Sequence, residues 1–301
     1  IFSFLLDLAG LMAIIGILMA MWRRYVKKPA RLDNKPDDGI VLVWILVVLI
    51  TGFLAEGARI AFDKPAYEVW SFVGWFVASF FASMDKDAVK IAHKVFWYFH
   101  MVISFGLIAY IAYSRLLHII TSSLNMMFRG VEDAPRGAIA PIEDFENVEE
   151  FGVNSIENFS WRQVFDLDAC TRCGRCQDLC PAYATEKPLS PKQFIQDLKS
   201  EWERMATGAK NEDGLIDTVI QEETLWSCTA CLACQVNCPV SIPTFDKNIE
   251  MRRYLTLTLS KTTPETRLLF KNLQQKVDPY GMGKRQRTEW TEGLEIKNAG
   301  E

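Results

Sequence analysis

The chain has 301 residues, of which 50% are hydrophobic and 23% are charged, and its formal net charge is −4. A charge this close to neutral gives no reason to expect nucleic-acid binding. The average conceals two different halves. Residues 1–122 are rich in large apolar side chains, whereas residues 123–301 have the composition of an ordinary water-soluble protein. The sequence therefore predicts a membrane part followed by a soluble part.

Three apolar segments are long enough to cross a bilayer, which takes about 20 residues. A fourth segment, residues 69–84, is shorter and contains two tryptophans and several serines. This composition predicts an interfacial or re-entrant helix. The chain begins at Ile1 inside an apolar segment that lacks the features of a signal peptide, so we expect further chain before it. The three predicted spans are residues 1–22, 40–62 and 95–120.

The orientation in the membrane follows from basic residues in the loop after the first span. By the positive-inside rule, such a loop is cytoplasmic. If residues 69–84 do not cross, the third span runs from outside to inside and the soluble part is also cytoplasmic. The six basic residues of the loop are Arg23, Arg24, Lys27, Lys28, Arg31 and Lys35.

Two of the three histidines, His100 and His118, lie near the ends of the third predicted span. On one continuous helix their separation is about five turns, so both rings share a face, roughly 27 Å apart along the axis. Neutral imidazole is an axial ligand of haem iron, and the spacing predicts two stacked b haems. The alternative is an interfacial histidine and a polar contact between helices. We expect His93 to be solvent-exposed or to line a quinone pocket.

Two bis-histidine haems need four axial ligands, and the first two predicted spans contain no histidine. The partner ligands therefore lie upstream of Ile1 or on another chain, or the haems are absent. Glu56 and Arg59 are one helical turn apart near the end of the second span. We expect them to pair with each other, to contact a haem propionate, or to bind a quinone head group.

All eight cysteines lie in two runs, CTRCGRCQDLCP and CTACLACQVNCP. Both follow the C-x₂-C-x₂-C-x₃-C-P pattern of two-cluster ferredoxins, in which the fourth cysteine binds the other cluster. Zinc is the rival metal, but it favours paired C-x₂-C units. With no cysteines left for disulfides, the sequence indicates a reducing compartment. The predicted ligands are Cys170, Cys173, Cys176 and Cys238 for cluster one, and Cys228, Cys231, Cys234 and Cys180 for cluster two.

The soluble part is predicted to be helical around these cysteines. Residues 123–160 are predicted to form an acidic linker, either a solvated connector or a docking face. Ser190 and Pro191 are typical of a helix start, and Phe194, Leu198 and Trp202 form a core stripe on that helix. The predicted fold is mainly α, a transmembrane helical bundle (1–122) followed by an α-helical two-[4Fe–4S] ferredoxin domain (161–301). Other predicted helices are 217–223, 246–258 and 265–276.

Two motifs carry a resemblance to a known family. The His-x₁₇-His spacing resembles the last span of the cytochrome b subunit of respiratory nitrate reductase. YSRLLHIITSSLNMMFR followed by CTRCGRCQDLCPAYATEKPLSPK resembles the membrane-bound, heterodisulfide-reductase-D-like iron–sulfur oxidoreductases, especially those that link electron-transfer flavoprotein to (mena)quinone. The resemblance implies haem ligation by His100 and His118 and two [4Fe–4S] clusters on the eight cysteines. It also implies N-terminal helices with the partner histidines and a C-terminal cysteine-rich domain, which this sequence lacks.

The expected function is membrane-bound electron transfer between a cytoplasmic donor, electron-transfer flavoprotein, and menaquinone or ubiquinone. The expected location is the inner membrane of a prokaryote, with the iron–sulfur domain cytoplasmic. One alternative is a non-catalytic wiring and anchor subunit of a larger heterodisulfide-reductase-like respiratory complex. The other is a membrane-tethered ferredoxin without haem. A haem spectrum separates the last interpretation from the first two.

Overall fold

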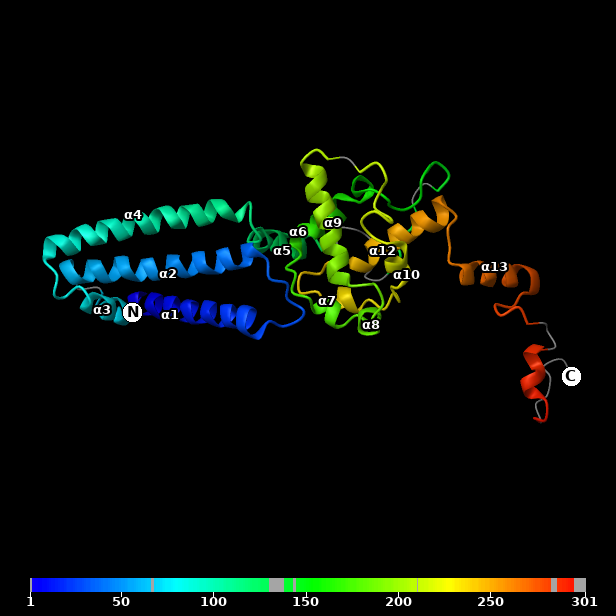
Figure 1. Ribbon diagram of the computed structural model, residues 1–301, viewed down its shortest axis with the longest axis horizontal. Helices are drawn as coiled ribbons and strands as arrows, with labels where there is room; N and C mark the ends of the chain where they lie inside the picture. Colours follow the sequence, from blue (N-terminus) through cyan, green and yellow to red (C-terminus); the bar gives the residue numbers. More distant parts are fainter. Residues whose placement is uncertain are drawn as a thin grey trace.

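The computed structural model describes residues 2–65, 68–129, 138–142, 145–209, 211–282 and 286–294. The described residues are mainly helical and contain one isolated β-bridge, between Ile216 and Ile220. Figure 1 shows an elongated molecule in which three long helices lead into a globular helical domain. The C-terminal helices project from the opposite side of that domain.

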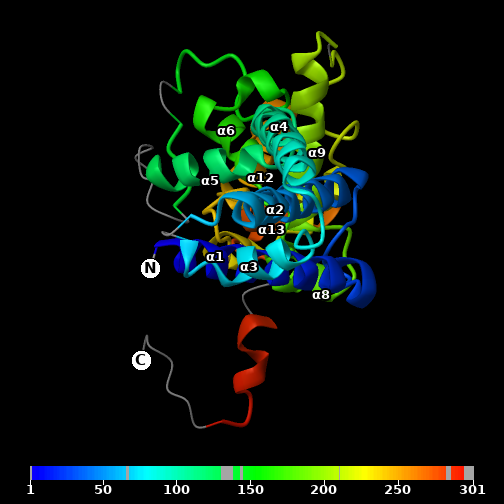
Figure 2. The same ribbon diagram turned by 90° about the vertical axis from the view of Figure 1, so that its left-hand side faces the viewer.

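The prediction of three long apolar segments is confirmed, because three helices are long and apolar enough to cross a membrane; the third, Lys86–Ile111, lies earlier in the chain than the predicted span 95–120. The middle helix lies between the other two, as both views show (Figures 1 and 2). Their outward faces remain apolar; Phe105, for example, is 65% exposed, as expected for a lipid-facing side chain. The membrane helices are α1 (Phe2–Met21), continued by the π-helical turn η1 (Trp22–Lys27), α2 (Pro36–Asp63), α3 (Phe72–Ser79) and α4 (Lys86–Ile111).

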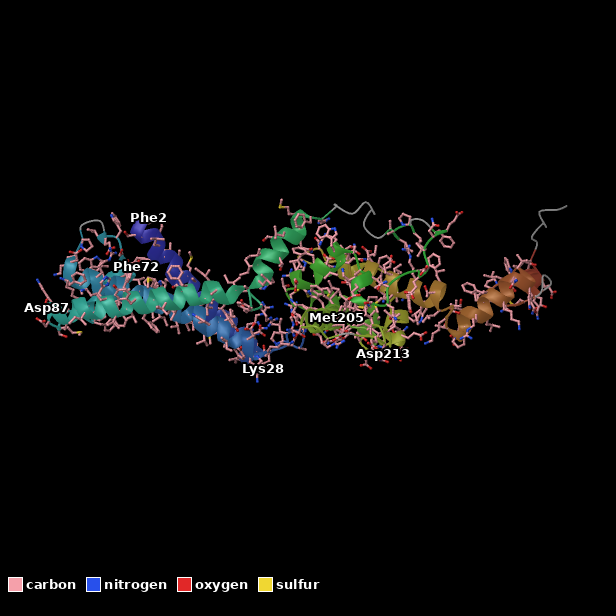
Figure 3. The ribbon with its side chains drawn as sticks, turned by 90° about the horizontal axis from the view of Figure 1, so that it is seen from above. Phe2, Lys28, Phe72, Asp87, Met205 and Asp213 are labelled. Carbon is pink, nitrogen blue, oxygen red and sulfur yellow. The ribbon has the colours of Figure 1, made fainter. Side chains whose placement is uncertain are left out.

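The short helix α3 lies within the segment for which the sequence predicts an interfacial or re-entrant helix, and it has eight residues. Its first turn is fixed to α1 by Asp7, whose buried carboxylate accepts the backbone N–H of Val73 at 2.7 Å and of Gly74 at 3.2 Å. A helix N-terminus stabilises a negative charge, which explains an acid within an apolar span. Figure 3 places Phe2, Phe72 and Asp87 at one end of the bundle and Lys28 at the end facing the soluble domain.

The predicted span 95–120 is not one continuous helix. Helix α4 ends at Ile111, the chain turns, and a separate helix, α5 (Leu117–Met127), follows. His118 therefore belongs to α5, whereas His100 belongs to α4. The prediction that both rings share one face of one helix is wrong, because the helical repeat cannot be counted through the turn.

Acidic residues at the start of α2 explain this turn. The carboxylate of Asp37 accepts the hydroxyl of Tyr110 at 2.6 Å and the backbone N–H of Arg115 at 3.3 Å. The guanidinium of Arg115 pairs with Asp38, which also accepts a hydrogen bond from Arg24 at 2.7 Å. Through these contacts, the backbone and the side chains of the turn bind residues that lie far away in the sequence.

In the soluble domain, the predicted helix start at Ser190 is confirmed. The Ser190 hydroxyl accepts the backbone N–H of Gln193 at 3.1 Å, and α9 (Pro191–Ala206) follows. Phe194 and Leu198 are buried in the main core, and Trp202 packs against it from its edge.

The prediction of a helix at 217–223 is wrong. Asp217 has a left-handed backbone (φ +65°), and its carboxylate accepts the N–H of Glu222 at 2.9 Å, so the helix begins later. The helices predicted at 246–258 and 265–276 are confirmed. The remaining elements are η3 (Ile156–Asn158), α6 (Trp161–Ala169), α7 (Arg175–Asp178), α8 (Pro181–Ala184), α10 (Glu222–Trp226), α11 (Ala233–Val236), α12 (Thr244–Arg253), η4 (Tyr254–Thr258), α13 (Pro264–Lys276) and η5 (Gln286–Thr291).

A buried polar network joins α5 to the soluble domain. Asp166 on α6 accepts hydrogen bonds from Arg162 at 2.7 Å and from Lys247 on α12 at 2.8 Å. The same arginine donates to the backbone carbonyl of Asn125 on α5 at 3.1 Å. Because α5 continues to Met127, the linker predicted at 123–160 begins later than expected; residues 130–137 and 143–144 lie outside the described residues.

Candidate redox sites

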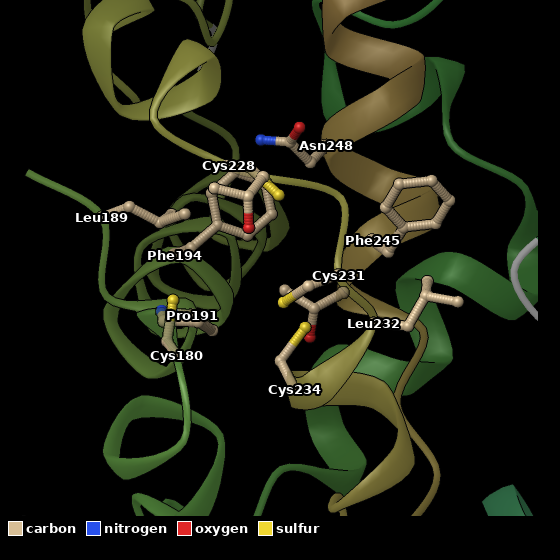
Figure 4. A pocket seen from close by; sticks show the side chains of 12 residues that line it. Cys180, Leu189, Pro191, Phe194, Cys228, Cys231, Leu232, Cys234, Phe245 and Asn248 are labelled. Atoms are coloured by element: carbon tan, nitrogen blue, oxygen red, sulfur yellow. The ribbon is translucent and has the colours of Figure 1, made fainter. Parts of the chain in front are cut away.

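One cavity of the soluble domain gathers cysteines from both runs. Cys228, Cys231 and Cys234 line it together with Cys180 of the first run, which approaches from the opposite side (Figure 4). Cys180 is buried and Cys231 is exposed. This is the set for which the sequence predicts the second cluster.

A second cavity holds the other set. Cys170, Cys173 and Cys176 line it with Cys238 of the second run, and Cys234 also reaches its wall. The backbone N–H of Ile242 donates to Cys238 Sγ at 3.4 Å, a contact that stabilises a thiolate. Each run therefore sends its last cysteine to the other run's cavity, as in two-cluster ferredoxins.

The loops between the cysteines have the same conformation in both runs. Arg172 and Ala230 are left-handed (φ +54° and +56°), and so are Gly174 and Leu232 two residues later (φ +74° and +61°). The repeated backbone turns successive cysteines towards one centre. The two loops differ in charge, because Arg172 stands where the second loop has an alanine.

Burial raises the pKa of four of the thiols, those of Cys170, Cys176, Cys234 and Cys238. Burial raises the pKa of Cys176 to about 12, and the neighbouring Cys170 and Cys238 add to the rise. Burial likewise raises the pKa of Cys234 to about 12, with Cys228 and Cys180 contributing. A bound iron–sulfur cluster supplies the positive charge that four clustered thiolates need, so this donor set fits such a cluster.

His100 on α4 is oriented by Thr51 on α2. The Thr51 hydroxyl donates to the carbonyl of Val47 at 2.8 Å and can accept Nδ1–H of His100 at 3.0 Å. Nε2 is 3.5 Å from Ser104 Oγ, at the limit of a hydrogen bond. A histidine whose Nδ1 is held by a hydrogen bond presents Nε2 as a metal ligand, which is the arrangement that haem ligation requires.

His118 on α5 has the same arrangement, since its Nδ1 donates to the backbone carbonyl of Arg115. Its ring borders a cavity of about 320 Å³ between the bundle and the soluble domain, and Cys170 lines the same cavity. Burial, together with the nearby Arg172 and Arg24, lowers the pKa of Arg115 to about 10. Charged side chains of both signs line this cavity, namely Lys35, Arg115, Arg172, Lys199, Asp37, Asp168 and Glu203.

A third cavity, of about 500 Å³, lies at the opposite end of the bundle. Apolar side chains of α1 and α2 form much of its wall, and its polar lining includes Asp7, Glu56, Arg59, Glu68 and His100. Arg59 forms an ion pair with Glu68, a partner that the sequence did not suggest, and Glu56 lines the same cavity. His93 is not among the lining residues; its Nδ1 donates to the carbonyl of Ala55 at 2.9 Å.

Sequence reasoning missed three of these residues. Thr51 gave no signal, because a hydroxyl within a span is common. Asp7 was visible as the sole charge of its span, and a carboxylate at that depth indicates a specific partner. Glu68 lies outside the spans, yet it is 4% exposed and its Oε2 has no hydrogen-bond partner among the described residues.

The sequence matches the nitrate reductase gamma subunit family over residues 4–132 and the 4Fe-4S dicluster domain family over residues 166–242. It is 37% identical to the EtfAB:quinone oxidoreductase of Syntrophomonas wolfei, over 96% of this chain and 45% of that protein. It is 26% identical to the "Probable iron-sulfur-binding oxidoreductase FadF" of Bacillus subtilis, over 96% of this chain and 46% of that protein.

A third relative matches a shorter stretch of the chain. One subunit of the ferredoxin:CoB-CoM heterodisulfide reductase of Methanosarcina mazei is 33% identical, over 29% of this chain and 45% of that protein. No solved structure matches. The chain spans slightly less than half the length of the first two relatives. The chain is therefore a homologue of EtfAB:quinone oxidoreductase over nearly its whole length, with a membrane part that matches the nitrate reductase gamma subunit model and a soluble part that matches the 4Fe-4S dicluster model.

Proposed function

We propose that the chain is the membrane electron-transfer segment of an oxidoreductase that links electron-transfer flavoprotein to menaquinone or ubiquinone. The observation that carries the proposal is the cavity shared by His118 and Cys170, which brings a candidate haem ligand next to a candidate cluster ligand at the boundary of the two halves. When bound, clusters and haems supply one-electron transfer. The residues of this chain set the order in which they lie.

That order runs from the soluble domain into the membrane. Cys231 is the exposed cysteine of its cavity, on the side where a protein partner can approach. Cys170 borders both the cavity of cluster one and the cavity beside His118. His100 lies on α4 and lines the third cavity, at the far end of the bundle. The residues are compatible with electron flow in either direction.

Haem b fits the two histidines chemically. Each ring has its Nδ1 held and its Nε2 available. In the cavity beside His118, four cations outnumber three carboxylates, and these cations are the candidate partners for the two propionates of a haem. A bis-histidine haem at either site would need one further axial ligand besides the histidine named here.

The third cavity, at the end of the bundle far from the soluble domain, is our proposed quinone site. Its apolar wall suits a quinone ring and the isoprenoid tail that the ring carries, and Arg59 and Glu56 are the candidate contacts of the head group. Oε2 of the buried Glu68, which lacks a hydrogen-bond partner within the described part of the chain, supports a polar ligand there. The basic loop and the soluble domain lie at the same end of the bundle (Figure 3). Because a basic loop is typically cytoplasmic, this arrangement supports an inner-membrane protein whose iron–sulfur domain lies in the cytoplasm.

The deciding experiment is a reduced-minus-oxidised visible spectrum of the purified protein with its native partner chains, with haem and non-haem iron counted. We expect a b-type α-band and about eight non-haem irons per chain. His100→Ala and His118→Ala should each remove one haem, whereas His93→Ala should keep both. Iron–sulfur absorbance without a haem band would leave a membrane-tethered ferredoxin instead.

A second candidate function is a wiring and anchor subunit of a heterodisulfide-reductase-like complex. The match of 29% of this chain to a heterodisulfide reductase subunit favours it. Purification with separate chains that carry the partner histidines and a cysteine-rich domain would support this interpretation over a single longer polypeptide.

A further inference from the structure

The loop between the first two spans, residues 28–35, lies between the membrane bundle and the soluble domain. On the membrane side Arg24 holds it, donating to the carbonyl of Asp33 at 3.1 Å and to Asn34 Oδ1 at 2.9 Å. Arg24 also bonds Asp38 at the start of α2 at 2.7 Å. The loop is thereby fixed to the ends of both spans.

On the other side the same loop contacts the first cysteine run. The carboxylate of Asp33 pairs with both Arg172 and Lys192. Lys192 also donates to the carbonyl of Arg31 at 2.9 Å, and Arg31 lies 3.3 Å from the carboxylate of Asp178. Arg172 and Lys192 are 13% and 10% exposed, and Asp33 is 34% exposed, so the two cations are largely buried and the carboxylate is partly open to solvent.

The contact also reaches the backbone. Gly174 follows Cys173 and is left-handed (φ +74°). A Cβ on this residue would lie 2.7 Å from the carbonyl oxygen of Arg31 and 2.9 Å from its Cβ, which real structures do not tolerate. Glycine is thus needed at this position for the loop 28–35 to contact the first cysteine run. Besides the ion pairs, this close approach is a second observation that the loop docks there.

The pKa of Asp33 is consistent with its two ion pairs. Burial by itself raises the pKa of Asp33, but the hydrogen bond and ion pair with Lys192 and the charge of Arg172 hold that pKa below its usual value. The group is therefore a carboxylate at neutral pH. It is the acid paired with Arg172, which lies between the candidate ligands Cys170 and Cys173.

We propose that Asp33 is a positioning residue for electron transfer, which docks the cytoplasmic loop onto the first cysteine run and neutralises Arg172 beside cluster one. The inference rests on the proposed ligation of that cluster by Cys170, Cys173, Cys176 and Cys238. A cation near an iron–sulfur cluster stabilises its reduced, more negative state and raises its reduction potential. The Asp33 carboxylate opposes that effect, and the second run, with Ala230 at the equivalent position, has no such arginine.

The test is a potentiometric titration of both clusters by electron paramagnetic resonance, on the full chain with its native partners. Asp33→Asn should shift the midpoint potential of one cluster to a more positive value and leave the other unchanged. Asp33→Glu should restore most of the wild-type value. Asp213→Asn is the control, because it changes the charge by the same amount at an exposed position of the soluble domain.

Arg172→Gln provides an independent variant, since it should shift the same cluster to a more negative potential. In the double variant the two effects should be less than additive, because each group acts through the other. If Asp33→Asn behaves like Asp213→Asn, the inference is overturned while the proposed function stands. Wild-type protein without two [4Fe–4S] signals would overturn both.

Discussion

The buried network around Asp166 gives a prediction with a defined magnitude. Asp166 and Lys247 are fully buried, and the side chain of Arg162 is 6% exposed. Asp166→Asn keeps the shape of the side chain but leaves two buried cations without their carboxylate. Removing one partner of a buried ion pair costs about 3–5 kcal/mol. For a domain of this size that is a fall in Tm of roughly 6–20 °C.

Asp168→Asn is the matched control, two residues further along α6. Asp168 is 30% exposed and pairs with Lys199 at 3.1 Å. Such a surface pair contributes less than about 1 kcal/mol. Thermal unfolding of the full chain in detergent, followed by circular dichroism and by cluster absorbance, measures both variants.

The double variant Asp166→Asn/Lys247→Met sharpens the test. It removes one uncompensated buried charge, so it should recover part of the stability that Asp166→Asn loses. The reasoning would be refuted if Asp166→Asn were as mild as Asp168→Asn, or if the double variant were less stable than the single one.

Three further outcomes are expected. Cys180→Ala should abolish the cluster of the second run and Cys176→Ala that of the first, as read from iron content and resonance signals; the opposite assignment would contradict the crossed pairing. Thr51→Val should weaken haem retention at His100 by about 10- to 100-fold, whereas Ser123→Ala should not. The hydrogen bond from Arg204 holds the pKa of Glu201 below 4.5. The contact with Arg204 therefore stabilises the protein above pH 4.5, and this stabilisation is lost as the pH falls through the pKa that Glu201 has in the folded protein. The wild type should thus have a higher Tm than Glu201→Gln at neutral pH, and the difference should vanish in acid.

The features predicted correctly from the sequence are those encoded by neighbouring residues. Cysteine spacing predicted which cysteine of each run lies with the other run, since the spacing itself dictates the loop. Hydropathy predicted three spans, because burying apolar side chains in lipid needs no tertiary partner. Ser190 and Pro191 predicted the start of α9 for the same local reason.

The features missed depend on residues distant in sequence. The turn that separates α4 from α5 requires Asp37 to meet Arg115, 78 positions later, and no window of hydropathy contains both. Docking of the loop on the first cysteine run joins Asp33 to Arg172 across 139 positions. Arg31 and Lys35 could be counted as charges that orient the protein, but their contacts could not be anticipated.

The turn between α4 and α5 also determines which part of the molecule carries each histidine. Thr121 and Ser122 on α5 donate to the carbonyls of Asp168 and Ala169 at 3.0 Å, directly before Cys170. Helix α5 is therefore held at one end by the soluble domain and at the other by the bundle, because His118 bonds Arg115 and Arg115 bonds Asp37 and Asp38 of α2. The two parts of the molecule are joined firmly at this short helix. At the haem site that we propose, His118 would keep its distance both from Cys170 and from His100 in the bundle.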